Sequence, residues 1–339
     1  MTVKNGIKNF FRENYKIIIF FIIIFTIINF KVPYYIFTSG GITDLSNRFE
    51  LSEDYDQEGS YNLSYVNQID GNVLTYLLSY IMPDWEKIEV EKYQLNENET
   101  MNELMIRDKL SLTHANQTAV ITAYSNAEKK IDYKDFKYYV YATYEFLESD
   151  KHIMIGDTLV SVDGNIINDT DEITNYIQEK EINDYIELTL NRNGETYTTK
   201  VKVKEQNGRK MIGILFFKIY DMETEPKITF KFKDSESGSS AGLMTTLAIY
   251  DALIPEDLTH GLKIAGTGTI EANEKIGEIG GIKYKLAGAV KDGADIFFAP
   301  SGENYEEAIK LKKDKGYKID VVEVKTLKDA INYLKNLKG

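Results

Sequence analysis

Apolar and polar residues recur with two different periods along this chain, and together these periods predict a mixed α+β or α/β protein. Alternation predicts strands at residues 60–66, 185–190, 196–203, 228–232 and 262–270. Apolar segments without that alternation predict helices at residues 72–82, 96–124, 171–180, 241–253, 305–313 and 327–337. A short apolar run at 296–300 predicts a buried strand, and residues 321–324 predict a further strand before the last helix. Strand and helix therefore take turns toward the C-terminus, as in a layered α/β fold.

The N-terminal segment is basic and then apolar. Thr26 is the only polar residue of the uncharged run 17–28, and four basic residues precede this run, at Lys4, Lys8, Arg12 and Lys16. The aromatic stretch 32–37 extends a run that is short for a span of about 20 residues. A cleaved signal peptide and a buried core helix are the alternatives, but no Ala-x-Ala-type cleavage signal follows. We predict an uncleaved transmembrane anchor in residues 1–37, with the lipid bilayer as a partner, a cytoplasmic N-terminus and the remainder outside.

Composition narrows the classes of partner and chemistry. The 339 residues suffice for two ordinary domains and a further segment. A net charge of −13 argues against nucleic acid as a partner. The chain has no cysteine, which excludes disulfides, thiolate zinc sites and a cysteine nucleophile. It also has no His-Glu-x-x-His motif and no phosphate-binding loop, so we expect no metal and no cofactor.

Two short stretches carry candidate catalytic residues. Ser240 lies where a predicted strand breaks into small and polar residues before a helical run, so its hydroxyl would lie near free backbone N–H groups. Such a serine can act as a nucleophile with an oxyanion hole. Lys285 follows the Gly280-Gly281 turn, 45 positions later in the sequence (285 − 240), and a buried neutral lysine can activate a serine. Each residue alone has an ordinary interpretation, as a helix cap and as a surface lysine.

The same residues resemble the proteolytic domain of Lon. The matching elements are Ser239-Ser240-Ala241-Gly242 and Gly280-Gly281-Ile282-Lys283-Tyr284-Lys285. The resemblance implies that Ser240 is the nucleophile and Lys285 its base. It further implies supporting roles for Thr267, beside the lysine, and for Gly238 and Ser239, beside the serine. Ser239 replaces the proline of the Lon element, and Ser237 occupies its upstream aspartate position.

A histidine-based triad is the weaker alternative mechanism. The chain has only three histidines, at His114, His152 and His260, and His260 lies in a turn at a predicted helix end, where a basic side chain is ordinary. Because no phosphate-binding loop accompanies the Lon-like stretch, we expect a peptidase that works without ATP.

Residues 127–208 resemble a PDZ domain. Three of its elements occur in the same order, as Gly156-Asp157, Val162-Asp163-Gly164 and Arg192-Asn193-Gly194, the last of which is also a strong hairpin signal. Asp163 is interpreted as a turn residue. The resemblance implies that this segment captures extended peptide chains by adding a strand to an open sheet edge.

This order of segments resembles the membrane-anchored, PDZ-containing Lon-like serine proteases of the YlbL and SepM type. The anchor would occupy residues 1–37, the two parts of the Lon-like domain 38–126 and 209–339, and an inserted PDZ domain 127–208. The resemblance implies a serine endopeptidase in the cell membrane that cleaves peptides or exposed protein segments at the outer face, such as secreted signalling peptides. Peptide or unfolded protein is the expected substrate, and a homo-oligomer is left open. The alternative is a PDZ-based binding or assembly module with an inactive Lon-like scaffold, for which Ser237 and Ser239 are the only support.

Overall fold

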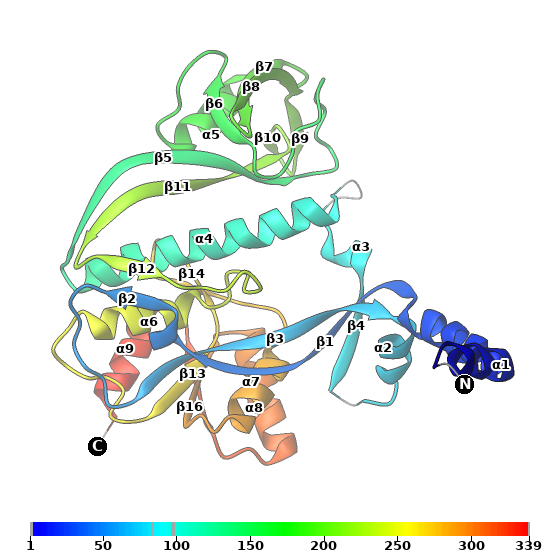
Figure 1. Ribbon diagram of the computed structural model, residues 1–339. Helices are drawn as coiled ribbons and strands as arrows, with labels where there is room; N and C mark the ends of the chain where they lie inside the picture. The colour runs from blue at the N-terminus through cyan, green and yellow to red at the C-terminus, as the bar shows by residue number, and fades with distance from the viewer. Residues whose placement is uncertain (1–2, 83, 96–98, 338–339) are drawn as a thin grey trace. The chain divides into compact units, whose positions relative to one another are not determined.

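The computed structural model describes residues 3–82, 84–95 and 99–337 (Figure 1). The chain forms two compact units, a smaller one of Met1–Ser39 with Val66–Tyr93 and a larger one of Gly40–Tyr65 with Gln94–Gly339. Some residues of the predicted segments lie outside the described ranges. These are the first two residues of the predicted anchor, the start of the helix predicted at 96–124, and the last two residues of the chain.

The smaller unit contains helices α1 (Val3–Asn29), α2 (Val73–Leu78) and α3 (Val90–Tyr93). Strand β1 (Lys31–Asp44) pairs antiparallel with β4 (Trp85–Glu89) from Tyr34 to Thr38. Asn72 caps α2 with a reciprocal capping box to Thr75, which explains why the predicted helix begins at this position.

The predicted membrane-spanning helix is not found. Among the described residues, no helix combines the length and the apolar character that crossing a membrane requires. The uncharged run 17–28 has 12 residues (28 − 17 + 1), which extends about 18 Å as a helix, against about 30 Å of bilayer hydrocarbon. The aromatic stretch 32–37 does not lengthen it, because these β-branched and aromatic residues belong to strand β1.

A parallel sheet forms the centre of the larger unit. Its strands follow in the order β17 (Asp320–Val324), β16 (Ile296–Pro300), β13 (Lys263–Gly266) and β3 (Ser60–Asn72), whose first residues pair with β13. Helix α6 (Gly242–Ala252) precedes β13 in the chain. Helices α7 (Ile282–Lys291), α8 (Glu303–Lys315) and α9 (Leu327–Lys335) follow β13, β16 and β17, respectively. The alternation predicted for the C-terminal part is confirmed.

Both faces of this sheet are covered. Ile264 and Phe298 belong to the core that α6 and α9 complete, whereas Ala265 and Phe297 belong to the core beside α7 and α8. Neighbouring residues of one strand point to opposite faces, so β13 and β16 contribute to both cores. Helices α6 and α7 are therefore both held against this sheet, one on each face.

A long helix, α4 (Met101–Asn126), packs against α6 through Ala119, Val120 and Ala123. Thr100 and Glu103 form a reciprocal capping box at its start. The half-buried Asp108 interrupts the apolar stripe of this helix, and its backbone carbonyl accepts a hydrogen bond from Gly238 N at 3.1 Å.

A separate core lies between α5 (Thr170–Glu179) and an antiparallel sheet of five strands. The strand order is β11 (Ile214–Glu225), β5 (Lys130–Thr143), β6 (Thr158–Val162), β7 (Tyr185–Arg192) and β8 (Glu195–Lys202). Strand β11 therefore lies at one edge of the sheet, although its residues follow the segment 127–208 in sequence.

Short elements complete the chain. These are η1 (Leu45–Asn47), the pair β2 (Phe49–Leu51) and β12 (Ile228–Phe230), the pair β9 (Lys204–Gln206) and β10 (Arg209–Met211), and the pair β14 (Thr269–Ile270) and β15 (Ile276–Gly277).

Candidate active site

Ser240 lies in the loop between β12 and α6, just before the helix begins. Ala241 is the N-cap residue of α6, and Gly242 N donates to Ser239 O at 3.1 Å. Within the described part of the chain, the backbone N–H groups of Ser239, Ser240 and Ala241 donate no hydrogen bond. They remain available at the positive end of the helix dipole, where a negative charge on a bound group is stabilised.

Lys285 lies in the first turn of α7. Gly281 caps this helix in a left-handed conformation with φ of 72°, and Lys285 N donates to Gly281 O at 3.2 Å. The side-chain amine reaches back across the site, so that Nζ lies 2.6 Å from Ser240 Oγ.

Burial determines the charge of this lysine. Lys285 is 3% exposed, and its neighbours in the helix include the fully buried Ile282 and Leu286. Removal of the ammonium group from water lowers the pKa of Lys285 from 10.5 to about 7. A substantial fraction of the amine is therefore neutral at neutral pH and can accept a proton.

Thr267 connects the two residues. It lies just after β13 and is fully buried. Its Oγ1 lies 2.9 Å from Lys285 Nζ and donates to Ser240 O at 3.0 Å. Gly268 N also donates to Ser240 O, at 2.9 Å, so the backbone of the serine is held from the β13 side.

The three histidines lie elsewhere. His114 stacks on Phe217 with ring centroids 4.2 Å apart, and His260 Nε2 lies 3.0 Å from Leu334 O. His152 Nε2 lies 3.8 Å from a Glu103 carboxylate oxygen. None of these contacts involves Ser240, so the geometry of a histidine triad is absent. Asp163 follows β6 and binds Tyr176 of α5, Lys180 at the end of that helix and the Glu187 backbone of β7, in agreement with a turn role.

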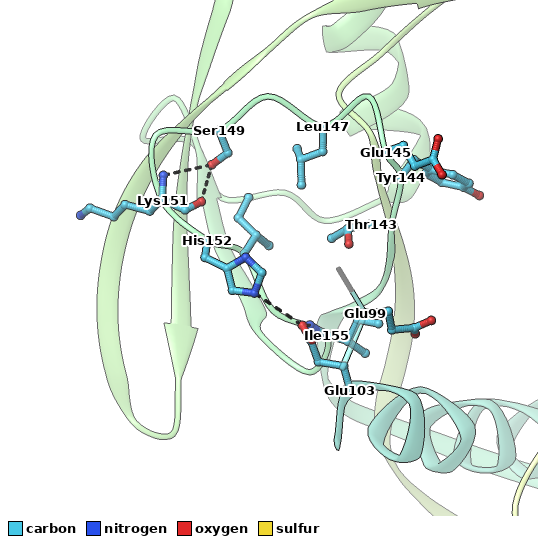
Figure 2. Close-up of a pocket in the computed structure, with 11 residues that line it drawn as sticks. Glu99, Glu103, Thr143, Tyr144, Glu145, Leu147, Ser149, Lys151, His152 and Ile155 are labelled. Carbon is cyan, nitrogen blue, oxygen red and sulfur yellow. Dashed lines mark hydrogen bonds and ion pairs between the residues drawn. The ribbon is translucent and has the colours of Figure 1, made fainter. Parts of the chain in front are cut away.

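Two cavities lie away from Ser240. The one in Figure 2, of about 330 Å³, lies between the start of α4 and residues 143–155, where Glu103 and His152 face each other. The other, of about 590 Å³, lies between α4 and residues 220–230. Among the described residues, no group of three or more His, Asp or Glu side chains could hold a metal ion.

The outer edge of β11 is partly occupied. The side-chain amide of Gln117, on α4, accepts from Tyr220 N at 2.9 Å and donates to Tyr220 O at 2.6 Å. Within the described residues, no strand pairs with this edge between Ile214 and Ile219. Phe216 of β11 packs against the same core as Ile173 and Ile177 of α5.

The sequence motifs gave no indication of a second group of residues around the serine loop. Arg48, Lys109 and Glu236 bind one another or the loop backbone, as described below. Arg48 and Glu236 are 188 positions apart, and no periodicity or motif spacing in a single sequence connects residues at that distance.

Comparison with known proteins supports parts of this interpretation. Residues 147–203 match the PDZ domain family. Lon protease from Mesomycoplasma hyopneumoniae (strain 232) is 31% identical over 99 residues, which is 29% of this chain and 11% of that protein. The chain thus matches only a small part of the length of that relative.

Solved structures match over about a quarter of the chain. The PDZ domain of the SdrC-like protein from Listeria monocytogenes is 21% identical, with a TM-score of 0.21, and covers 23% of this chain and 85% of that domain. The PDZ domain of the SdrC-like protein from Listeria innocua is 23% identical, with a TM-score of 0.22, over 24% of this chain and 92% of that domain. The chain is a mixed α/β protein that contains a PDZ domain and a stretch related to Lon protease.

Proposed function

We propose that this chain is an ATP-independent serine peptidase in which Ser240 is the nucleophile and Lys285 is the general base. The observation that carries the proposal is the distance of 2.6 Å between Ser240 Oγ and the amine of a lysine that is 3% exposed. An ordinary surface lysine is an ammonium ion and cannot accept the serine proton. Lys285 differs because burial lowers its pKa to about 7.

The reaction follows from these positions. Ser240 Oγ attacks the peptide carbonyl while Lys285 Nζ takes the hydroxyl proton. The backbone N–H groups of Ser239, Ser240 and Ala241 are the candidates to stabilise the oxyanion. The Lys285 ammonium then protonates the leaving amine, and the acyl-enzyme remains on Ser240. In the second half, the neutral amine takes a proton from water and the water oxygen attacks the ester. The Lys285 ammonium then returns this proton to Ser240 Oγ as the acid product leaves.

Thr267 and Gly238 have supporting roles in this proposal. Thr267 Oγ1 contacts both the lysine amine and the serine carbonyl, so it orients the base relative to the nucleophile. Gly238 supplies a turn with φ of 86° two residues before Ser240. The serine at position 239 takes the place of the proline in the Lon element and still accepts a hydrogen bond from Gly242 N.

We further propose that the open edge of β11 captures substrate. PDZ domains bind extended peptides by strand addition, and the segment 214–219 offers an outer edge with which no strand of the described residues pairs. The outer-face location in the cell and assembly into an oligomer stay predictions from the family resemblance.

The test uses the full chain as wild type, Ser240→Ala and Lys285→Met. Each is incubated with an unstructured protein such as casein without ATP, and the products are identified by mass spectrometry. Cleavage by the wild type alone is expected. Equal cleavage by all three variants would refute the assignment of both residues. Peptide binding by a wild type that never cleaves would favour the alternative, a binding module with an inactive scaffold.

A further inference from the structure

The loop that carries Ser240 has no regular secondary structure of its own. Strand β12 ends at Phe230 and α6 begins at Gly242, and the intervening residues include four serines and one glycine. Fixing one residue of such a chain costs about 1–2 kcal/mol of conformational entropy. Contacts from other elements must therefore hold the loop if Ser240 Oγ is to stay beside Lys285.

One such contact is an ion pair between Glu236 and Arg48. Arg48 Nε and Nη2 both lie 2.8 Å from Glu236 Oε1, and Arg48 is 8% exposed. The other carboxylate oxygen accepts from Lys233 N at 2.7 Å. Arg48 is itself fixed, because its carbonyl accepts from Lys231 N at 2.8 Å and its side chain also binds Asn47 O. The loop is thus joined to the segment that follows η1 by a charge-assisted, largely buried bond.

Helix α4 provides the second set of contacts. Lys109 Nζ donates to the carbonyls of Asp234 and Glu236, the latter at 3.0 Å. One residue earlier, the carbonyl of Asp108 accepts from Gly238 N at 3.1 Å. These bonds fix the loop backbone up to two residues before the serine.

We propose that Arg48, Lys109 and Glu236 are positioning residues for Ser240. They form a clamp, defined as these three side chains, that holds residues 233–238 so that Ser240 Oγ meets the amine of Lys285. None of the three contacts Ser240 or Lys285 through a hydrogen bond or ion pair among the described residues. The inference rests on the proposed function, since it assigns how the nucleophile of that site is held.

The geometry explains why the clamp matters for Ser240 in particular. The serine carbonyl is fixed on its far side by Thr267 and Gly268. On the near side, Gly238 is a residue about which the chain can pivot, because glycine adopts many backbone conformations. Without the clamp, residues 233–237 lose their side-chain anchors, and the bond from Gly238 N to Asp108 O is left to hold this end of the loop, so the direction of the Ser240 side chain is less firmly fixed. A displacement of about 1 Å at a reacting atom can slow a reaction about 100-fold.

The experiment measures how fast Ser240 of the full-length chain is modified by a small alkyl fluorophosphonate, with the modified residue identified by mass spectrometry. This probe needs no peptide capture, so it reports on the nucleophile alone. The variants are Arg48→Met, Glu236→Gln and Lys109→Met, together with the charge exchange that combines Arg48→Glu with Glu236→Arg. Lys231→Met is the matched control, because Lys231 forms an exposed ion pair with Glu50 in the neighbouring strand pair.

We expect the rate of modification to fall about 100-fold in Arg48→Met and Glu236→Gln, and the control to keep the wild-type rate. The charge exchange should be modified at least about ten times faster than Arg48→Met and Glu236→Gln. A general loss of stability would not produce such a recovery of the rate. With a peptide substrate, kcat should fall while KM stays unchanged, because the clamp residues do not touch substrate. Lys109 is exposed, so Lys109→Met should fold normally and still show the reduced rate.

Two results would overturn the proposal: wild-type rates in the three single variants, or losses that the charge exchange does not relieve and that match the unfolded fraction measured by circular dichroism. Failure of the proposed function looks different. In that case the wild type itself is not modified at Ser240, or Lys285→Met is modified as fast as the wild type.

Discussion

The burial of Lys285 predicts that replacing this lysine makes the protein more stable at neutral pH. The pKa of Lys285 falls from 10.5 in the unfolded chain to about 7 in the folded one, which corresponds to about 5 kcal/mol between the two protonation states. At pH 7 the folded state bears about 4 kcal/mol of this cost. Lys285→Met removes the cost but also removes the contacts of the amine with Ser240 and Thr267, worth about 1 kcal/mol each. We expect a net stabilisation of about 2 kcal/mol together with complete loss of peptidase activity.

The pH dependence of stability distinguishes removal of the buried amine from a simple improvement in the packing of Lys285→Met. The folded-state pKa of Lys285 lies below the unfolded one, so between pH 7 and 10.5 the unfolded chain binds more protons than the folded chain. The wild type therefore gains stability as the pH rises through this window, by about 2 kcal/mol from pH 7 to pH 9. Lys285→Met lacks this gain, so its advantage should disappear near pH 9.

Urea unfolding followed by circular dichroism at pH 6, 7, 8 and 9 measures the difference. Tryptophan fluorescence is unsuitable, because the single tryptophan, Trp85, belongs to the smaller unit. Lys291→Met, which removes an exposed lysine from the same helix, is the matched control and should show no such trend. A difference between wild type and Lys285→Met that stays constant from pH 7 to pH 9 would refute the reasoning, since it would mean that the lysine is not neutralised by folding.

Three further predictions concern activity and binding. The neutral amine of Lys285 is the active form and its pKa is about 7, so kcat/KM should rise about tenfold per pH unit below pH 7 and level off above pH 7. Initial rates measured from pH 5 to 9 check this expectation, and a flat profile contradicts it. Thr267→Val removes the hydroxyl beside Lys285 and should lower kcat about tenfold, whereas Thr267→Ser should retain most activity in the same assay. The outward backbone groups of Tyr220 bind Gln117, and because backbone groups alternate along a strand, those of Lys218 point to the same edge. Lys218→Pro in a Ser240→Ala background should therefore weaken the binding of a fluorescent extended peptide at least about fivefold in anisotropy titrations. Unchanged binding would place peptide capture elsewhere.

The sequence predicted most clearly those elements whose signal is local. Strand and helix alternate from β13 to α9 because each strand has a short apolar run and each helix its own turn residues. The interruption of the α4 stripe by Asp108 had no explanation in the helix itself. The structure adds that the backbone carbonyl at this position accepts a hydrogen bond from Gly238 N in the serine loop, 130 residues later (238 − 108); this contact helps to hold the loop, but it does not depend on the aspartate side chain.

The features that the sequence did not predict depend on distant residues. Stretch 32–37 has an apolar and aromatic composition that suits both a membrane anchor and a strand, and pairing with β4 decides for the strand. The PDZ-like sheet receives its edge strand, β11, from residues that follow the segment with the PDZ motifs. The motifs and their spacing indicated Ser240 and Lys285, but they could not indicate that the Arg48 side chain reaches the loop that carries Ser240.

The stability cost of the site explains where its parts are placed. A neutral lysine base requires burial, and burial of Lys285 costs the folded state about 4 kcal/mol at pH 7. That cost is tolerable only where apolar packing on both sides is dense. Leu286 follows the lysine in one core, and Leu243 follows the serine loop in another, and both are fully buried. The two helices are therefore fixed by their cores, while the serine loop, which lacks regular secondary structure, depends on Arg48, Lys109 and Glu236. A substitution in the clamp can therefore change the activity without changing either core, and this places a sensitive point of the proposed enzyme outside its catalytic pair.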